Sequence, residues 1–494
     1  MPYLYSTVQV RSYESQLIDR GIVSLDGLLS AAFQAIWRHV QPHLKRQFKI
    51  LVVSGKGYNG TDGLMLALHM WRNGYHVDLC MVSHSGLNPL AQSLYDEIKM
   101  SGLACIDHPD CSTYDICIDA ILGIGFNGHH LKPAVKSLIQ EINRRKGICI
   151  SIDCPSGINA DTGMVFDDAV RADITIMLLL RKKGLYSADA FDYRGELVFD
   201  HCFLEYRDLL DRVSSIDLVG LNRNLFDPET PRANVDKRDF GRVLVVGGNV
   251  GMLGAVLLSS SAASRSGVGH VTLCVKDSDR VILPFDYTTV SLSDMPGLLA
   301  GSAINAVLVG PGLGQDAWSL ACLKCCLSHA LPTVIDADAL RLVSEHHLDL
   351  HDQVIITPHH GEAAALLRCT VDAVAQDRFQ ACIDLHAHYG VHLILKGPGP
   401  IVLSRYEMYL IDASCPGLAV AGSGDVLAGI IVGLLGQRLK INKALLMDAL
   451  LIHLHVGCYW EKQFQGRGMI ASDMLSMIPL IKNQLSDGHY DTNN

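Results

Sequence analysis

The strongest constraint on the fold is a series of short, unbroken apolar runs that end in glycine or polar residues and are mostly separated by helix-like segments. Five such runs occur in the first half of the chain: FKILVVSGKG, HVDLCMVS, DICIDAILGIG, GICISIDCPSG and ADITIMLLL. Strands that are covered on both faces lack the alternation of apolar and polar residues, and parallel strands need crossover helices between them. The pattern therefore predicts a parallel α/β sheet with helices on both faces.

A second series begins with FGRVLVVGGNVGMLGA and continues through GHVTLCV, AVLVGPGLG, PTVIDADAL, QVIITPHHGE and VHLILKGPGP. The sequence between about Phe203 and Arg232 has no regular strand or helix pattern, so we place the domain boundary there. A chain of 494 residues is expected to hold two or three domains, and we predict two α/β domains, residues 1–214 and 225–494. Ahead of the first strand, the apolar spacing from Ser12 to about Val40 is helical.

Composition narrows the range of partners. A hydrophobic fraction of 49% excludes a disordered chain, and a net charge of -10 without a long Lys/Arg run argues against nucleic-acid binding. The fifteen scattered cysteines indicate a reduced, cytoplasmic protein. The first residues lack the pattern of a signal peptide, and the longest apolar runs are about half as long as a bilayer span. We therefore expect a soluble cytoplasmic protein that binds neither nucleic acid nor membranes.

Polar residues lie at the ends of three strands of the first half. The loop SGKGYNGTDG contains Asn59, Asp119 ends the next strong strand, and Asp153 and Ser156 follow another. Open parallel sheets bind ligands outside the carboxyl ends of their strands, so these side chains are expected at one crevice. Their oxygen atoms suit a hard cation. Each aspartate taken alone could instead cap a helix or a turn.

The first half contains three motifs in order, SGKGYNGTDG, IDAILGIGFNG and SIDCPSG. They are similar, in the same order, to the patterns GxGNNGGDG, DALxGxGxxG and DxPSG of a known family. By these motifs, residues 1 to about 210 resemble the NAD(P)H-hydrate epimerase (YjeF N-terminal) family. The resemblance implies a Rossmann-like fold, a hydrated nicotinamide dinucleotide as substrate, Asp153 as the acid/base group, and a potassium ion (K+) held by Asn59, Asp119 and Ser156. The substrate-binding residues it implies are Tyr58, Asn59, Gly60, Thr61, Asp62, Gly123, Ile124, Gly125, Phe126, Asn127, Gly128, His129 and Asp153.

This half departs from the family pattern in two places. Tyr58 and Thr61 stand where family members usually have Asn and Gly, and Thr61 adds a side chain where close approach of the backbone is expected. The segment LLSAAF (residues 28–33) lacks the acid, amide and glycine of the family's LMExAG. One alternative is therefore a degenerate, non-catalytic binding or assembly domain attached to a working second half.

The stretch AGSGDVLAGIIVGLL places Asp425 between a glycine turn and an apolar helix. Gly422, Ser423 and Gly424 would direct backbone N–H groups from a helix N-terminus at an anion. A carboxylate beside such an anion hole is useful if it accepts the proton of a hydroxyl group that receives a phosphoryl group. The alternative is a simple acidic residue in the first turn of a helix.

Other loops of the second half are expected at the same sheet edge. GPGLG and KGPGP are glycine-rich strand exits, and Lys396 in the latter could place a positive charge on nucleotide phosphates. TPHHGE places His359 and His360 at a third strand end, where one histidine is expected to face the cleft. In IDADAL, Asp336 or Asp338 could orient substrate or magnesium while the other caps a helix.

Six ordered motifs, FGRVLVVGG, GPGLG, DADAL, TPHHGE, LKGPG and AGSGDVLAG, resemble the ADP/ATP-dependent NAD(P)H-hydrate dehydratase (YjeF C-terminal) family over residues 230 to about 485. The resemblance implies a ribokinase-like fold and phosphorylation of the C6 hydroxyl of the S-hydrate by ADP with Mg2+, with Asp425 as the base. The implied dinucleotide-binding residues are Ala255, Gly314, His359 and Asp425. Those implied to hold the adenine nucleotide are Lys396, Gly397, Pro398, Gly399, Pro400 and Gly424.

Together the two resemblances predict a repair enzyme for hydrated NADH and NADPH. The first half would interconvert the R and S forms of NADHX and NADPHX, and the second would convert the S form to NAD(P)H, with AMP and phosphate as the other products. The resemblance also suggests a homo-oligomer. The alternative from another reaction class is a ribokinase-like kinase of a small vitamin precursor, which would use the same glycine turn and aspartate.

Overall fold

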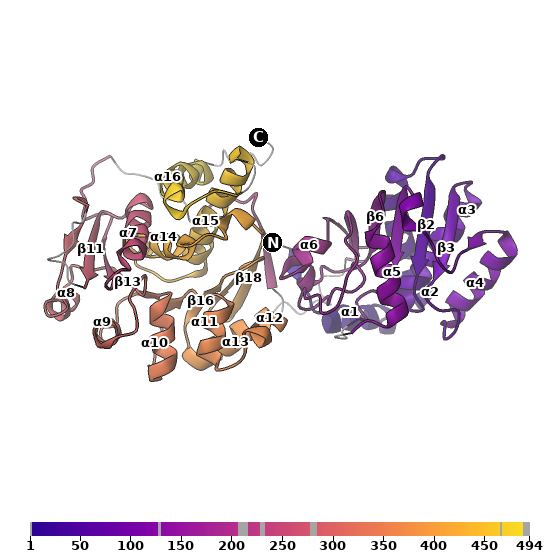
Figure 1. Ribbon diagram of the computed structural model, residues 1–494. Helices are drawn as coiled ribbons and strands as arrows, with labels where there is room; N and C mark the ends of the chain where they lie inside the picture. The colour runs from indigo at the N-terminus through magenta and orange to yellow at the C-terminus, as the bar shows by residue number, and fades with distance from the viewer. Residues whose placement is uncertain are drawn as a thin grey trace. The chain divides into compact units, whose positions relative to one another are not determined.

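The computed structural model describes residues 2–126, 130–205, 216–227, 233–276, 284–464 and 467–487. The chain divides into two compact units, Met1–Asp217 and Leu218–Asn494 (Figure 1), and the division falls between the two predicted domains. Each unit is an α/β structure built on a largely parallel sheet, as predicted.

All strand pairs in the main sheet of the first unit are parallel. The strand order is β4-β3-β2-β5-β6-β7-β8, so the direction of winding reverses between β2 and β5, where open sheets bind ligands. The strands are β2 (Lys49–Ser54), β3 (His76–Met81), β4 (Ala104–Cys105), β5 (Ile116–Ala120), β6 (Ile148–Ile152), β7 (Ile174–Leu178) and β8 (Glu196–Asp200).

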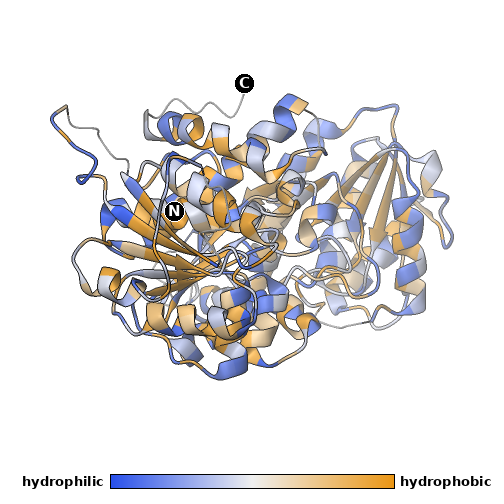
Figure 2. Ribbon diagram, turned by 60° about the vertical axis from the view of Figure 1, so that its left-hand side comes forward, coloured by the Kyte–Doolittle hydropathy of each residue, from blue (hydrophilic) through white to orange (hydrophobic). Residues whose placement is uncertain are grey.

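Helices cover both faces of this sheet. One core cluster includes apolar residues of α2 (Leu25–Val40), α3 (Tyr58–Arg72) and α4 (Pro89–Ser101), and another is centred on α5 (Pro133–Asn143). The short elements are η1 (Gln41–His43), η2 (Cys111–Thr113), η3 (Lys183–Tyr186) and α6 (Ala190–Tyr193). Figure 2 shows the strands of both units as mainly hydrophobic ribbons, whereas the helices carry hydrophobic and hydrophilic residues. The continuous apolar runs are thus buried strands, as expected.

The segment from Ser12 to Val40, which was predicted to be helical, belongs to two helices, α1 (Thr7–Asp19) and α2. Gly21, with φ of +67°, lies in the break between them, and the side chains of Ser6 and Ser24 cap the two N-termini. A glycine after one helix and a serine before the next are the usual signals for such a break. The predicted helical character is confirmed, but the apolar spacing did not reveal the break because it continues across the turn.

The stretch predicted to be irregular contains a strand, β9 (Ile216–Gly220). It pairs with β1 (Tyr3–Leu4) in antiparallel register, Tyr3 opposite Asp217 and Leu4 opposite Ile216. The partner strand lies at the other end of the first unit in sequence, so local pattern did not reveal the pairing.

The sheet of the second unit runs β18-β17-β16-β15-β14-β13-β10-β11-β12. Neighbouring strands from β12 through to β16 are paired in parallel. The pairs β16–β17 and β17–β18 are antiparallel. The winding reverses between β10 and β13. The strands are β10 (Arg242–Gly247), β11 (His270–Val275), β12 (Thr288–Thr289), β13 (Ala306–Val309), β14 (Thr333–Ile335), β15 (Val354–Ile356), β16 (His392–Leu395), β17 (Ile401–Ser404) and β18 (Glu407–Asp412).

Figure 1 shows two groups of helices in this unit, one on each side of the sheet. The first group consists of α7 (Leu253–Arg265), α14 (Ser423–Arg438), α15 (Lys443–Phe464) and α16 (Ala471–Asp487), and its apolar residues join those of the strands in one core cluster. The second consists of α9 (Ala317–Leu327), α10 (Asp338–His346), α11 (His360–Leu367), α12 (Val371–Gln376) and α13 (Arg378–Tyr389). The remaining short elements are α8 (Met295–Ala300) and η6 (Pro416–Leu418).

Glycines bring α14 unusually close to α7. A Cβ atom on Gly429 would lie 2.2 Å from the carbonyl oxygen of Ser259, and one on Gly433 would lie 2.7 Å from that of Ala263. Real side chains do not fit at these distances, so only glycine permits the contact. The contact sets the position of the N-terminus of α14, and with it Asp425.

Two further observations bear on the cellular setting. All fifteen cysteines are free thiols. Among the described residues, none of the helices is both long enough and apolar enough to cross a membrane.

Candidate active sites

A cavity of about 950 Å³ lies at the carboxyl ends of the strands in the first unit. Its walls come from α1, α2 and the loops after β2, β5, β6 and β7. It takes in eight of the predicted substrate-binding residues: Tyr58, Asn59, Asp62, Gly123, Ile124, Gly125, Phe126 and Asp153. The predicted residues Asn127, Gly128 and His129 lie outside the described residues.

Gly60 and Thr61 are buried and do not line this cavity. A Cβ atom on Gly60 would lie 1.9 Å from the carbonyl oxygen of Gly55, so the glycine is needed for the turn itself. The Thr61 hydroxyl donates to the carbonyl of Gly57 and accepts from Asn88, which caps α4. The extra side chain of Thr61 therefore points into the structure rather than into the space where a ligand would lie.

The three predicted cation ligands are brought together. Asp119 is fully buried and accepts hydrogen bonds from the hydroxyl of Ser156 (2.6 Å) and from its amide (2.8 Å). The Asn59 side-chain amide donates to the carbonyl of Leu122 (2.9 Å), which lies 3.3 Å from the Ser156 hydroxyl. Asn59, Asp119 and Ser156 therefore form one connected cluster at the point where the sheet reverses its winding.

The donor set of this cluster fits a hard cation. The Oδ1 atom of Asn59 is buried and has no hydrogen-bond partner among the residues that the structure describes, which is costly unless something binds it. Burial raises the pKa of Asp119, although the hydrogen bonds from Ser156, Ser151 and Ile121 counteract this. A cation at the cluster would satisfy the amide oxygen and compensate the buried carboxylate.

Asp153 follows β6 with φ of +67°, a conformation that side-chain-bearing residues rarely adopt. Its carboxylate forms an ion pair with Lys182. The Lys182 side chain is 1% exposed, and its ammonium group also donates to the carbonyl of Leu178 at 2.6 Å. The unusual backbone turns the Asp153 carboxylate into the cavity and toward a buried lysine.

Sequence reasoning missed Lys182. It stands in the run RKKGLY, directly after the fifth apolar run, where charged residues are ordinarily solvated. Its position at a strand end was the one available signal. Two more carboxyl groups, Glu14 and Asp62, line the same cavity, and burial followed by repulsion from Asp153 raises the pKa of both.

In the second unit, α14 begins with Gly422 as its N-cap (φ +89°) and has no side-chain cap. The first N–H groups of a helix have no partner within the helix, so this end offers donors to an anion. Asp425 lies in the first turn. Burial raises the pKa of Asp425 to about 7, with Asp336 adding to the shift and Lys396 opposing it. A carboxyl group with this pKa can accept or release a proton near neutral pH.

Lys396 lies against the start of α14. Its ammonium group is 2.9 Å from Oδ1 of Asp336 and 3.6 Å from Oε2 of Glu362. A Cβ atom on Gly424 would lie 3.3 Å from that nitrogen. Burial lowers the pKa of Lys396, but Asp336 and Glu362 outweigh this and raise it overall. The lysine is thus a positive charge held beside the anion-binding helix end.

Two aspartates follow β14 on either side of a strained residue. Ala337 has φ of +50° without being glycine, and such a conformation persists only where the surrounding structure holds it. On one side Asp336 pairs with Lys396. On the other, Asp338 begins α10 and accepts from the amide of Gly314 at 2.8 Å. The turn therefore directs one carboxylate to the lysine and the other to the GPGLG loop.

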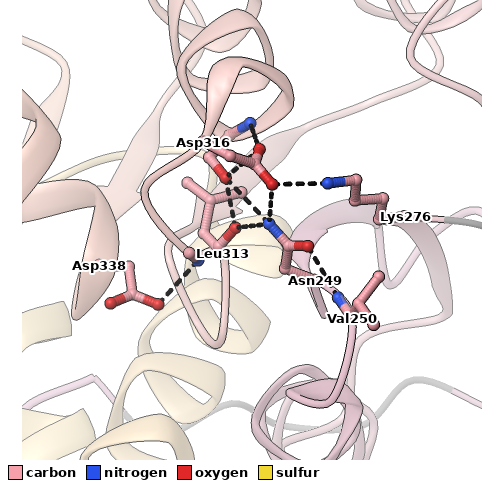
Figure 3. A network of polar contacts seen from close by, with 8 residues as sticks. Asn249, Val250, Lys276, Leu313, Asp316 and Asp338 are labelled. Atoms are coloured by element: carbon pink, nitrogen blue, oxygen red, sulfur yellow. Dashed lines mark hydrogen bonds and ion pairs between the residues drawn. The ribbon is translucent and has the colours of Figure 1, made fainter.

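A hydrogen-bonded network holds the GPGLG loop (Figure 3). The Asn249 side-chain amide donates to the carbonyl of Leu313 (3.0 Å) and to Asp316 (2.9 Å). Asp316 caps α9 and lies 2.5 Å from the ammonium group of Lys276. The hydrogen bonds from Lys276 and Asn249 hold the pKa of Asp316 well below its usual range. This network was not predicted, since its members come from three separate loops.

Gly314 and Ala255 lie close to one another in this region. A Cβ atom on Gly314 would lie 2.7 Å from Nδ2 of Asn249 and 3.2 Å from the terminal methyl group of Met252. A Cβ atom on Gly312 would lie 3.2 Å from that of Ala255, which is in the first turn of α7. The loop after β13 and the start of α7 therefore lie against one another near the point where this sheet reverses its winding.

The two histidines of TPHHGE have different environments. His359 is the N-cap of α11, and its Nδ1 atom accepts from the amides of Gly361 and Glu362. Its side chain is 60% exposed, with Nε2 3.4 Å from Glu362. His360 is turned inward instead, and burial lowers its pKa to about 4. His359 is thus the histidine that is open to a ligand.

The KGPGP loop rests on a buried arginine that sequence reasoning missed. Arg378, the first residue of α13, is 0% exposed and donates to the carbonyls of Pro398 and Lys396. Gly397 has φ of +133°, and a Cβ atom there would lie 3.1 Å from the guanidinium. The arginine therefore fixes the loop from beneath, leaving Gly397, Pro398, Gly399 and Pro400 as the segment that follows Lys396.

Comparison with known proteins gives one family for each unit. A family model described as NAD(P)H-hydrate dehydratase matches residues 243–480. A model described as the YjeF-related protein N-terminus matches residues 26–184. The first span includes Asn249, Lys396 and Asp425, and the second includes Asn59 and Lys182.

Several curated relatives match both units together. The bifunctional NAD(P)H-hydrate repair enzyme Nnr of Coxiella burnetii is 33% identical over 98% of this chain and 100% of its own length. That of Vibrio cholerae is 32% identical over 96% of this chain and 97% of its own, and that of Escherichia coli is 30% identical over 93% and 90%.

Solved structures match somewhat more than half of the chain. A ribokinase-like superfamily protein of Enterococcus faecalis is 24% identical and aligns over 57% of this chain and 99% of its own, with a TM-score of 0.49. The ADP/ATP-dependent NAD(P)H-hydrate dehydratase of Bacillus subtilis, crystallised with ATP and Mg2+, is 23% identical over 54% and 96%, with a TM-score of 0.48.

Proposed function

The chain belongs to the family of bifunctional NAD(P)H-hydrate repair enzymes, and from this membership we propose how its two units divide the reaction. Residues 1–214 epimerise the R and S forms of NADHX and NADPHX. Residues 225–494 dehydrate the S form to NADH or NADPH, with ADP as the phosphoryl donor. The division is chemically economical, because a dehydratase alone would leave the R epimer unrepaired.

The dehydratase reaction begins at Asp425. Its carboxylate accepts the proton of the C6 hydroxyl group, and the hydroxyl oxygen attacks the terminal phosphoryl group of ADP, releasing AMP. The N–H groups at the start of α14 and the ammonium group of Lys396 stabilise the charge on the transferred group. Two observations support these roles: the pKa of Asp425 is about 7, and the adjacent helix end offers N–H groups that can donate hydrogen bonds to an anion.

The second step breaks the C6–O bond. The bonding electron pair leaves with phosphate, the ring loses a proton from the adjacent carbon, and the double bond of NAD(P)H is restored. Phosphate is a far better leaving group than hydroxide, which is the reason for phosphorylating the hydroxyl first. Ala255, Gly314 and His359 are proposed to contact the dinucleotide during both steps, and Gly397, Pro398, Gly399 and Pro400 the adenine nucleotide.

The residues around Lys396 fit magnesium brought in on the nucleotide. Among the described residues, no three His, Cys, Asp or Glu side chains are grouped so as to hold a metal ion by themselves. Asp336 and Glu362 nevertheless lie within reach of Lys396 and of any phosphate bound there. Magnesium usually takes one or two carboxylates together with phosphate oxygens, and there it would neutralise charge on the transferred group.

For epimerisation we propose Asp153 and Lys182 as the acid/base pair. A C6 hydroxyl leaves as water after gaining a proton, and water returns to the other face of the ring after losing one. Both transfers need a proton-carrying group at the ring, and Asp153 faces the cavity with Lys182 behind it. Asn59, Asp119 and Ser156 would hold potassium, which would attract the phosphates of the dinucleotide.

A mixture of R- and S-NADHX with ADP, magnesium and potassium tests both halves by NADH absorbance. We expect complete conversion, faster than spontaneous epimerisation, and none with Asp425→Asn. Conversion that stops at the S fraction and then continues at the spontaneous rate would mean that the first unit is not a working epimerase. A stable phosphorylated product with no NADH would point to a kinase instead.

Sequence reasoning alone supports three finer points, the first two through the resemblance and the third through the scattered cysteines. We propose ADP rather than ATP as the donor, a homo-oligomeric assembly and a cytoplasmic location. Replacing ADP by ATP in the same assay tests the first point, sedimentation velocity of the purified chain tests the second, and fractionation of cells tests the third. A higher kcat/KM with ATP, a sedimenting monomer, or recovery outside the cytoplasm would contradict them.

A further inference from the structure

A buried histidine lies directly behind the anion-binding turn. His453, on α15, is 7% exposed. Its Nε2 atom is 3.0 Å from the carbonyl oxygen of Ser423 and 3.1 Å from the Ser423 hydroxyl. Neither sequence patterns nor the proposed reaction assigns a role to His453.

The tautomer of His453 follows from its surroundings. Burial lowers the pKa of the ring to about 4, so it is neutral at physiological pH. A carbonyl oxygen can only accept a hydrogen bond, so Nε2 must carry the proton of the neutral ring. One Nε2–H group therefore donates to the carbonyl of Ser423, with the hydroxyl oxygen as a second acceptor.

The bond to this carbonyl has a consequence for the neighbouring amide. In a trans peptide the C=O and N–H groups point in opposite directions within one plane. Holding the Ser423 carbonyl against His453 therefore turns the N–H group of Gly424 away from α15. On the side where Gly424 lacks a side chain lies the ammonium group of Lys396, 3.3 Å from the position of a Cβ atom.

This turn has no side-chain cap, and glycines flank Ser423 on both sides. These two residues, Gly422 and Gly424, give the backbone extra freedom. Some helix starts of the unit are capped by side chains, α9 by Asp316 and α11 by His359, whereas α7 and α10 have no side-chain cap either. The N-cap of α14 is a glycine without a side-chain bond, so the first peptide of the helix is held from the side by His453.

We propose that His453 is a positioning residue of the phosphoryl-transfer site, which fixes the Ser423–Gly424 peptide so that the Gly424 amide points at the nucleotide phosphate. The proposal rests on the proposed function in one respect, that the start of α14 binds the phosphates of ADP. It adds a residue that touches neither substrate.

The test compares two amides at position 453 in the full-length enzyme. His453→Gln places an N–H donor near the position of Nε2, whereas the shorter side chain of His453→Asn does not reach the Ser423 carbonyl. Removing one donor of an anion hole costs about 10²- to 10³-fold in kcat, and misaligning one costs less. We expect His453→Asn to lower kcat by about 10- to 100-fold and to weaken ADP binding, and His453→Gln to recover most of both.

The matched control is His455, two residues further along α15. It is also buried, with a pKa lowered to about 4 by burial, but it faces the backbone of Leu221. We expect His455→Asn to lower thermal stability while leaving the KM and Kd for ADP unchanged. The KM for S-NADHX should stay the same in all variants, because the anchored amide serves the nucleotide and not the dinucleotide.

Calorimetric titration with ADP and magnesium separates this proposal from the proposed function, since ADP binding needs no dehydration. Wild-type ADP affinity in His453→Asn would overturn the inference, as would equal losses in His453→Asn and His455→Asn. Failure of His453→Gln to recover ADP binding in a folded protein would overturn it too. An inactive wild-type enzyme that still binds ADP would instead count against the dehydratase assignment.

Discussion

At the scale of single residues, Asp425 determines how the dehydratase responds to pH. A general base must be deprotonated, and the pKa of this carboxyl is raised to about 7 by burial and by Asp336. We therefore expect kcat/KM for S-NADHX to rise about tenfold per pH unit below pH ~7 and to level off above it. Initial rates between pH 6 and 9 check this, and a flat profile would remove Asp425 as the base.

The same shift predicts an effect on stability. The folded protein binds the Asp425 proton more tightly than the unfolded chain, where the pKa is about 3.9. The stability contributed by the protonated form is therefore present at low pH and is lost as pH rises from about 4 to about 7. Asp425→Asn removes this loss, so its melting temperature should exceed that of the wild type at pH 8. A lower melting temperature for the variant at pH 8 would contradict the assignment.

Lys182 is the residue that tests the epimerase site. Its ammonium group is buried and paired with Asp153, so Lys182→Met removes one member of the acid/base pair and leaves its partner without a counter-charge. We expect the rate of conversion of R-NADHX to fall about 10²-fold or more, with the dehydration of S-NADHX unchanged. The neighbouring Lys183→Met serves as the control, because Lys183 does not line the cavity. Equal rates of R-NADHX conversion in the two variants would contradict the assignment of Lys182 to the acid/base pair.

At the scale of elements, the packing of α14 against α7 carries the active-site turn. A Cβ atom on Gly429 would lie 2.2 Å from the Ser259 carbonyl, a backbone atom that cannot move alone. Gly429→Ala should therefore cost about 1–3 kcal/mol of unfolding free energy, measured by urea denaturation. The control is Gly297→Ala on α8, where a Cβ atom would meet nothing within 4 Å and alanine favours the helix. A Gly429→Ala variant as stable as that control would contradict the packing argument.

At the scale of the whole molecule, the two units have separate hydrophobic cores. The clusters of the first unit contain residues up to Leu204, and that of the second begins at Val219. We expect two calorimetric unfolding transitions, since multidomain chains seldom unfold in one step. ADP with magnesium should shift only the transition of the second unit to higher temperature. At a free ADP concentration of 100 times Kd, the unfolding free energy of that unit should rise by about 2.7 kcal/mol. A single transition that ADP shifts as a whole would contradict this.

The fold was largely predictable because its signals are local. Unbroken apolar runs mark buried strands wherever they occur, and glycine motifs mark the strand ends where ligands bind. Asn59, Asp119, Ser156 and Asp425 could be singled out in this way. Even so, the break between α1 and α2 and the strand β9 were missed, since the first hides within a continuous apolar spacing and the second depends on a partner strand distant in sequence.

The sequence by itself determined which strands, loops and acidic residues this protein has, because these follow from the local order of side chains. Tertiary structure alone decided how the acidic residues behave. The pKa of Asp425 depends on its burial, on Asp336 after β14 and on Lys396 of the KGPGP loop. The Asp153 carboxylate pairs with Lys182, whose sequence context is that of a solvent-exposed charge. Likewise, His453 lies behind Ser423 only because α15 packs against α14. Burial and electrostatic interaction act through space, so no local pattern contains them.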